Sequence, residues 1–250
     1  MDRAETGIKG FDKLIQGGFP RQFNVLFVGL PGTGKTIFSL QYLYNGAMNG
    51  EPGVYVSLDT IGDKVYEQGL QFGWDLKSLE NENKLSVIKV PLNREKIRIF
   101  DMIQTAVDRI KAKRLVFDSL AAFAINIDQF AIPLAFDDEI DRILGRSKPF
   151  SDSIMYEGNS EKRITYLTLN KLSDLGTTNI IVTDSVAEGS DSSVDGVSEY
   201  ICDGVVRLHA IEGEESFNTL NISKMRLTAV NRGIYNFSIG SKGIELKESV

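Results

Sequence analysis

Short runs of β-branched and aromatic residues alternate along the chain with segments whose apolar residues recur every three or four positions. Several runs are apolar on both faces, as in parallel strands that helices cover on both sides. The runs predict strands at Asn24–Gly29, Val54–Leu58, Leu85–Val90, Arg114–Asp118 and Asn179–Asp184. The periodic segments predict helices at Thr36–Met48, Ile97–Ile110 and Lys162–Leu175, with Gly176 as the C-terminal cap of the last. This alternation predicts an α/β fold with a mostly parallel, doubly wound sheet and helices on both faces.

The pattern changes after Asp203, where short strand-like runs follow one another without helices between them. They predict an antiparallel C-terminal extension of the sheet, with a hairpin turn at Ser241–Gly243. The segment Asn126–Ser160 is too long for an ordinary connection and only weakly periodic, so it is interpreted as an insertion. No motif occurs twice, and residues 1–250 are therefore expected to form a single domain.

Composition narrows the classes of function. The 250 residues carry a net charge of −6 and the pI is about 5.0, so no global basic field would draw the chain to nucleic acid or an anionic membrane. Cys202 and His209 are the only cysteine and the only histidine, which argues against an internal disulfide and against histidine-based metal sites or triads. No apolar run approaches the roughly 18 residues that span a bilayer, and we expect a cytoplasmic protein.

The strongest chemical signal is "GLPGTGKT", Gly29–Thr36, which matches the phosphate-binding P-loop pattern G-x-x-x-x-G-K-[ST]. A predicted strand leads into it and a predicted helix leaves it, so the backbone N–H groups and the helix N-terminus can face phosphate oxygens. Lys35 is expected to bridge the β- and γ-phosphates, and the Thr36 hydroxyl to bind Mg²⁺. The predicted nucleotide contacts are Leu30, Pro31, Gly32, Thr33, Gly34, Lys35, Thr36 and Ile37.

A second carboxylate is needed to hold the Mg²⁺ through its water shell. "RLVFDSL" supplies one at Asp118, at the end of a predicted buried strand. A charge in that place is costly unless it meets a cation, so Asp118 is the predicted metal-side acid. The alternative, an Asp that caps a turn, stays open at this point.

With these residues placed, the chain resembles the KaiC-like branch of the RecA superfamily of ATPases, which includes archaeal RadA-like recombinase paralogues. The resemblance rests on "TGIKGFDKLIQGGFP" (Thr6–Pro20), "FGWDL" (Phe72–Leu76) and "KMR" (Lys224–Arg226), and it runs over nearly the whole length. It implies a RecA-type core, binding of ATP or ADP with Mg²⁺, and a hexamer-like ring with nucleotide at the subunit interfaces. It also implies that Lys224 and Arg226 reach the ATP of a neighbouring subunit, and that Asp184 occupies a sensor-like position.

One departure from the family bears on catalysis. Where the family usually has paired glutamates at the tip of the second strand, this chain has Asp59 and Thr60. Asp59 is the candidate base that activates water, but it is one methylene shorter than Glu. Misplacement by about 1 Å can cost on the order of 100-fold in rate, so we expect slow hydrolysis.

Two alternatives to a slow, nucleotide-switched oligomer remain. The first is a recombinase paralogue that binds single-stranded DNA, but the corresponding loop, residues 185–200, has four acidic residues and no Lys or Arg. Such a loop repels phosphates, which disfavours DNA binding there without excluding it elsewhere. The second is an ATP-dependent scaffold in which Asp59 is inert.

Overall fold

The computed structural model describes residues 1–58, 64–90, 97–130, 160–186, 193–211 and 217–247. Asp59, Thr60 and residues 131–159 of the predicted insertion 126–160 lie outside these ranges. In the part of the chain that is described, no helix combines the length and apolarity needed to cross a membrane.

The central sheet has nine described strands in the order β11-β10-β9-β8-β3-β7-β6-β4-β5. The strands are β3 (Asn24–Gly29), β4 (Gly53–Ser57), β5 (Leu85–Lys89), β6 (Arg114–Asp118), β7 (Thr178–Asp184), β8 (Gly204–Ile211), β9 (Phe217–Met225), β10 (Ile234–Gly240) and β11 (Gly243–Leu246). The neighbours from β8 to β5 pair in parallel, whereas β8, β9, β10 and β11 pair antiparallel in succession. This confirms the predicted mostly parallel core with an antiparallel C-terminal extension.

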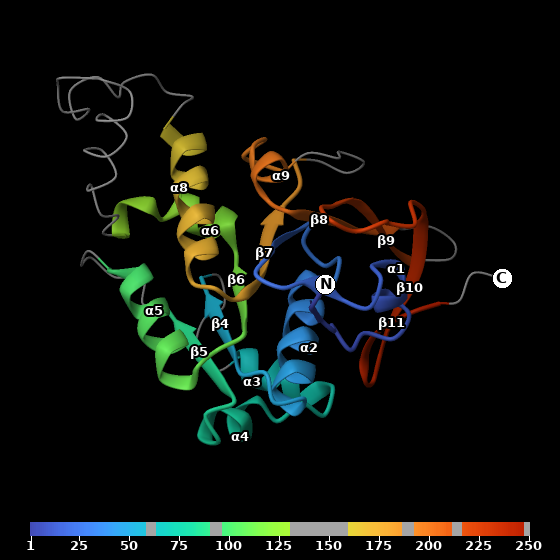
Figure 1. Ribbon diagram of the computed structural model, residues 1–250, viewed down its shortest axis with the longest axis horizontal. Helices are drawn as coiled ribbons and strands as arrows, with labels where there is room; N and C mark the ends of the chain where they lie inside the picture. The colour runs from blue at the N-terminus through green and yellow to red at the C-terminus, as the bar shows by residue number, and fades with distance from the viewer. Residues whose placement is uncertain (59–63, 91–96, 131–159, 187–192, 212–216, 248–250) are drawn as a thin grey trace.

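Helices cover both faces of the sheet. The helices are α1 (Phe11–Leu14), α2 (Lys35–Met48), α3 (Lys64–Gln71), α4 (Leu76–Asn81), α5 (Ile99–Ile110), α6 (Leu120–Ile125), η1 (Ile127–Gln129), α8 (Ser160–Asp174) and α9 (Ser198–Ile201). Figure 1 shows α5, α6 and α8 on one side of the parallel strands and α2 on the other. Two hydrophobic cores follow from this, one containing Phe38 of α2 and Tyr55 of β4, the other Ile103 of α5 and Phe123 of α6.

A small second sheet joins β1 (Arg3–Ala4) to β2 (Phe19–Pro20) in antiparallel pairing. Phe19 is fully buried and packs edge-on against Tyr42 of α2, at 5.7 Å between ring centroids. The N-terminal segment therefore closes the core on the face that α2 covers.

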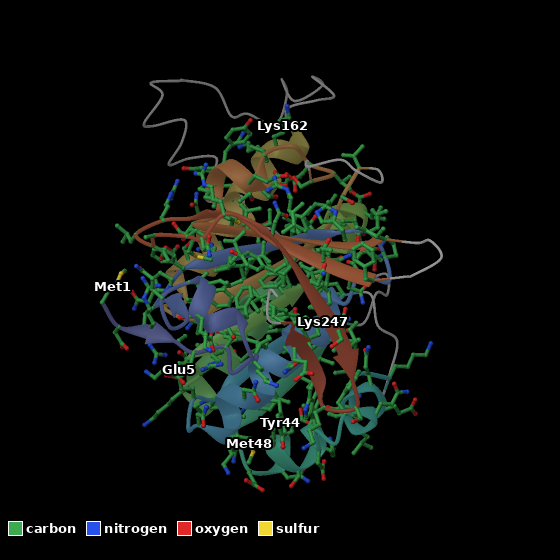
Figure 2. All side chains as sticks on the ribbon, turned by 90° about the vertical axis from the view of Figure 1, so that its right-hand side faces the viewer. Met1, Glu5, Tyr44, Met48, Lys162 and Lys247 are labelled. Atoms are coloured by element: carbon green, nitrogen blue, oxygen red, sulfur yellow. The ribbon has the colours of Figure 1, made fainter. Side chains whose placement is uncertain are left out.

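Strand β3 lies between β7 and β8, and parallel pairing sets the carboxyl ends of the strands at one edge. Gly29 is opposite Asp184, and Asp118 is opposite Val182. Helix α2 runs from this edge to the other end of the molecule, where Figure 2 shows Tyr44 and Met48 far from Lys162 near the start of α8. In an open α/β sheet a ligand binds outside the carboxyl ends of the strands, which is where the predicted site residues meet.

Candidate functional site

The P-loop connects the end of β3 to the start of α2. Gly32 and Gly34 have φ angles of 84° and 92°, in the left-handed region that a side chain disfavours, so the loop turns tightly where the motif has glycine. The loop borders a hollow of about 380 Å³, within the size range of sites that bind small molecules and cofactors. The loop residues that line it are Pro31, Gly32, Gly34, Lys35, Thr36 and Ile37.

Two of the predicted nucleotide contacts shape the loop and do not line the hollow. Thr33 is buried, and its hydroxyl donates to the Leu30 carbonyl oxygen at 2.8 Å. Leu30 in turn offers that carbonyl to Lys35. The side chain of Thr33 therefore stabilises the turn. That Leu30 and Thr33 also contact the nucleotide stays a prediction.

Lys35 is buried, and its ammonium has three oxygen partners. It donates to the carbonyl oxygens of Gly29 at 2.6 Å and Leu30 at 2.9 Å, and it forms an ion pair with Asp184 at 3.1 Å between Nζ and Oδ1. Asp184 also lines the hollow, from the end of β7. The structure thus brings the predicted phosphate-binding cation and the predicted sensor-like carboxylate into direct contact.

The two predicted metal-binding residues also meet. The Thr36 hydroxyl donates to Oδ2 of Asp118 at 2.9 Å, and both residues line the hollow. Oxygen ligands from a hydroxyl and one carboxylate are the donors that Mg²⁺ takes when substrate phosphates complete its coordination. Asp118 and Thr36 therefore fit the metal that the motif implies.

The residues that sequence reasoning missed come from β4 and α3. Tyr55 is fully buried in β4, and its hydroxyl donates to Oδ2 of Asp118 at 2.7 Å. Gln68 of α3 lines the hollow together with the loop residues. A tyrosine in an apolar strand is typical of a core residue, and no motif surrounds Gln68, so neither carried a signal.

The predicted catalytic base Asp59 lies outside the described residues. The residue before it, Leu58, is buried, and its backbone N–H donates to the Asp118 carbonyl oxygen at 2.8 Å. The predicted base therefore directly follows, in the sequence, a residue that is hydrogen-bonded to the predicted metal-side acid.

Lys224 and Arg226 lie apart from the P-loop, at the end of β9. The Lys224 ammonium donates to three carbonyl oxygens around the end of α9, those of Glu199 at 2.9 Å, Tyr200 at 3.1 Å and Cys202 at 2.6 Å. Burial, followed by the charge of Arg226, lowers the pKa of Lys224. Lys224 is thus held by carbonyl oxygens of its own chain, and its reach toward a neighbouring subunit, which the resemblance implies, stays a prediction.

The Arg226 guanidinium forms an ion pair with Asp203 at 3.0 Å, and 52% of its side chain is exposed. It borders a second hollow of about 390 Å³ that shares no residue with the P-loop hollow. Lys224 and Arg232 line the same hollow, so this end of β9 gathers three cations.

The acidic loop 185–200 is described at residues 185–186 and 193–200. Asp195 accepts the backbone N–H groups of Val197 at 2.8 Å and Ser198 at 2.7 Å, and Glu199 accepts the Ser193 hydroxyl at 2.6 Å. These carboxylates therefore order the entry to α9.

Comparisons with known proteins identify the family. A family model described as "ATPase: KaiC" matches residues 4–132 and 153–250. The circadian clock oscillator protein KaiC of Prochlorococcus marinus subsp. pastoris is 30% identical over 255 residues, covering 98% of this chain and 45% of that protein. The UPF0273 protein of Aeropyrum pernix is 32% identical over 261 residues, covering 98% of this chain and 93% of its own.

The crystal structure of a KaiC-like protein from Pyrococcus horikoshii OT3 superposes with a TM-score of 0.78 at 32% identity, covering 98% of this chain and 99% of that one. The chain spans less than half the length of the circadian clock relative but nearly all of the other two proteins. Since the family model covers most of the chain, the resemblance seen in the sequence is confirmed. The chain belongs to the KaiC family of ATPases in the RecA superfamily.

Proposed function

We propose that the protein binds ATP with Mg²⁺ and hydrolyses it slowly, as a nucleotide-dependent oligomeric switch. The observation that carries the proposal is the meeting of Lys35, Thr36 and Asp118 at one hollow of about 380 Å³, below a loop with two left-handed glycines. A buried ammonium beside backbone N–H groups recognises phosphate, and the start of a 14-residue helix adds positive potential.

Each residue has a role that its position supports. Lys35 would contact the β- and γ-phosphates, because its ammonium lies within the loop that would surround them. The Thr36 hydroxyl would bind the metal, and Asp118 would hold the metal's water shell. Mg²⁺ supplies charge neutralisation for the phosphates when it is bound.

Slow turnover is proposed for a chemical reason. Asp59 follows Leu58 in the sequence, and the backbone N–H of Leu58 donates to the carbonyl oxygen of Asp118 at the edge of the sheet where the phosphates would lie. Its side chain is one methylene shorter than Glu, and Thr60 offers no second carboxylate. A base whose reach falls short by about 1 Å lowers the rate on the order of 100-fold and leaves some hydrolysis.

Assembly into a hexamer-like ring is supported by the cations at the end of β9. Arg226 is half exposed, and among the described residues its partner charge is Asp203, which leaves part of its guanidinium accessible to a phosphate of a neighbouring subunit. Lys224 is committed to three carbonyl oxygens of its own subunit. We therefore assign the contact across the interface to Arg226 first, with Lys224 holding the backbone beside it.

The test is ATP binding and phosphate release by the wild type and Lys35→Ala, with Lys9→Ala as the control because Lys9 is an exposed lysine that pairs with Glu245. Lys35→Ala is expected to abolish binding, and Lys9→Ala to leave it unchanged. Wild-type affinity in Lys35→Ala would contradict the phosphate site.

Turnover is tested separately, by phosphate release from the wild type and Asp59→Asn with and without single-stranded DNA. Slow release that Asp59→Asn removes, without stimulation by DNA, is the expected result. Stimulation by DNA would favour the recombinase alternative, and ATP binding without any release would favour the non-hydrolysing scaffold.

A further inference from the structure

A buried tyrosine hydroxyl contacts the predicted metal-side acid. Tyr55 is in β4, which pairs in parallel with β6 so that Tyr55 is opposite Val116 and Ser57 is opposite Asp118. The phenol is fully buried, and its hydroxyl reaches along the sheet to donate to Oδ2 of Asp118 at 2.7 Å. Tyr55 thus connects the hydrophobic core beneath α2 to the carboxylate at the mouth of the hollow.

Two hydroxyls converge on this one oxygen. The Thr36 hydroxyl donates to the same Oδ2 at 2.9 Å, from the first turn of α2. A carboxylate held from two elements has a fixed orientation, and both hydrogen bonds are charge-assisted. Thr36 is itself a predicted metal-binding residue, whereas Tyr55 is anchored by its buried ring and holds Asp118 whatever Thr36 contacts.

We propose that Tyr55 is a positioning residue for the metal: through Asp118 it sets the protein's affinity for the Mg²⁺ that accompanies ATP. The proposal rests on the function proposed above and extends it to a residue that touches neither nucleotide nor metal. Groups that hydrogen-bond a metal's carboxylate orient it, and their removal typically costs 10- to 100-fold in metal affinity or activity. We expect Tyr55→Phe to raise the Mg²⁺ concentration needed for ATP binding by about 10-fold.

The chain provides a matched control in Tyr42. This tyrosine is also fully buried in the same hydrophobic core, and its hydroxyl donates to the Thr178 carbonyl oxygen at 3.1 Å. Tyr42→Phe removes the same atom from the same core without touching Asp118. A loss shared by both variants would reflect packing, and a loss confined to Tyr55→Phe would reflect the carboxylate.

The experiment measures binding of a fluorescent ATP analogue to the wild type, Tyr55→Phe and Tyr42→Phe across a Mg²⁺ titration and in excess EDTA. Binding of Mn²⁺ to the same three proteins with ATP, read by electron paramagnetic resonance, reports metal affinity without any turnover. The expected result is a higher metal requirement in Tyr55→Phe alone, with unchanged analogue binding in EDTA. Thermal unfolding in EDTA checks that all three proteins are folded.

A double-mutant cycle with Asp118→Asn locates the effect. If Tyr55 acts through Asp118, Tyr55→Phe adds no further metal requirement in the Asp118→Asn background. Metal dependence unchanged in Tyr55→Phe, or raised equally in Tyr42→Phe, would overturn the positioning role while leaving ATP binding intact. Absence of Mg²⁺-dependent binding in the wild type would overturn both this role and the proposed function.

Discussion

The contacts of Lys224 lead to a prediction that separates its structural role from a role at a subunit interface. Lys224→Met keeps the length of the side chain and removes the cation that three carbonyl oxygens around α9 share. A hydrogen bond to a charged group contributes about 1.5–3 kcal/mol to stability. The three bonds share one ammonium and the site is partly open to water, so their contributions do not simply add. We therefore expect Lys224→Met to lower the free energy of unfolding by about 2–3 kcal/mol.

Arg226→Met is the comparison, because it removes one exposed ion pair with Asp203. Such a pair contributes about 0–1 kcal/mol, so this variant should keep nearly wild-type stability and lose ATP turnover only where subunits associate. Equilibrium unfolding in urea measures both variants, provided that the slope of the transition is unchanged. Wild-type stability in Lys224→Met would refute the reasoning, since it would mean that the carbonyl contacts do not hold the ammonium in solution.

Two further predictions follow from the partly buried Glu51 and from the P-loop. Burial raises the pKa of Glu51, but hydrogen bonds from Arg21 and from the buried Arg114 outweigh this effect and hold the pKa below its usual 4.5. The ionised carboxylate therefore stabilises the folded state above pH 4.5. This contribution is lost as the pH falls through the lowered pKa of the folded state. Glu51→Gln should lower the free energy of unfolding by about 3 kcal/mol at neutral pH. It should also make stability depend less on pH in acid unfolding monitored by circular dichroism. Acid sensitivity equal to that of the wild type would contradict this prediction. Gly34→Ala should abolish ATP-analogue binding, because the residue has a φ of 92° and its new Cβ would lie 3.1 Å from Ile239; retained binding would contradict the strained loop.

The parallel core could be predicted because its strands are buried on both faces and their runs are continuously apolar. The predicted boundaries agree with the structure within two residues, although Leu58 and Val90 lie just beyond β4 and β5. The pairing of β1 with β2 could not be predicted, because each has two residues and the pairing is set by packing of Phe19 against α2. The order of the strands in the sheet could not be predicted either, because an apolar run does not indicate which strand it pairs with.

The site divides in the same way. Lys35, Thr36 and Asp118 were predicted because backbone geometry and metal chemistry restrict the residue types at those positions. Tyr55 and the carbonyl contacts of Lys224 were missed because what defines each is a contact between distant segments. Tyr55 meets Asp118 across two strands, and Lys224 meets carbonyl oxygens of α9 that become neighbours only once β8 and β9 have paired.

The contacts of Lys35 suggest how the predicted sensor-like role of Asp184 would work, and that role stays a prediction. An ammonium has three N–H donors, and the three partners of Lys35 are the carbonyl oxygens of Gly29 and Leu30 and the carboxylate of Asp184. The two carbonyls belong to the strand end and loop that carry Lys35, whereas Asp184 belongs to β7 and is 41% exposed at the hollow. A phosphate oxygen that contacts Lys35 repels the Asp184 carboxylate and competes with it for the same cation. If ATP binds as proposed, the end of β7 would be coupled to phosphate through one shared ammonium; along the chain that end is followed by the acidic loop 185–200 and by α9, where the Glu199 carbonyl oxygen accepts from Lys224.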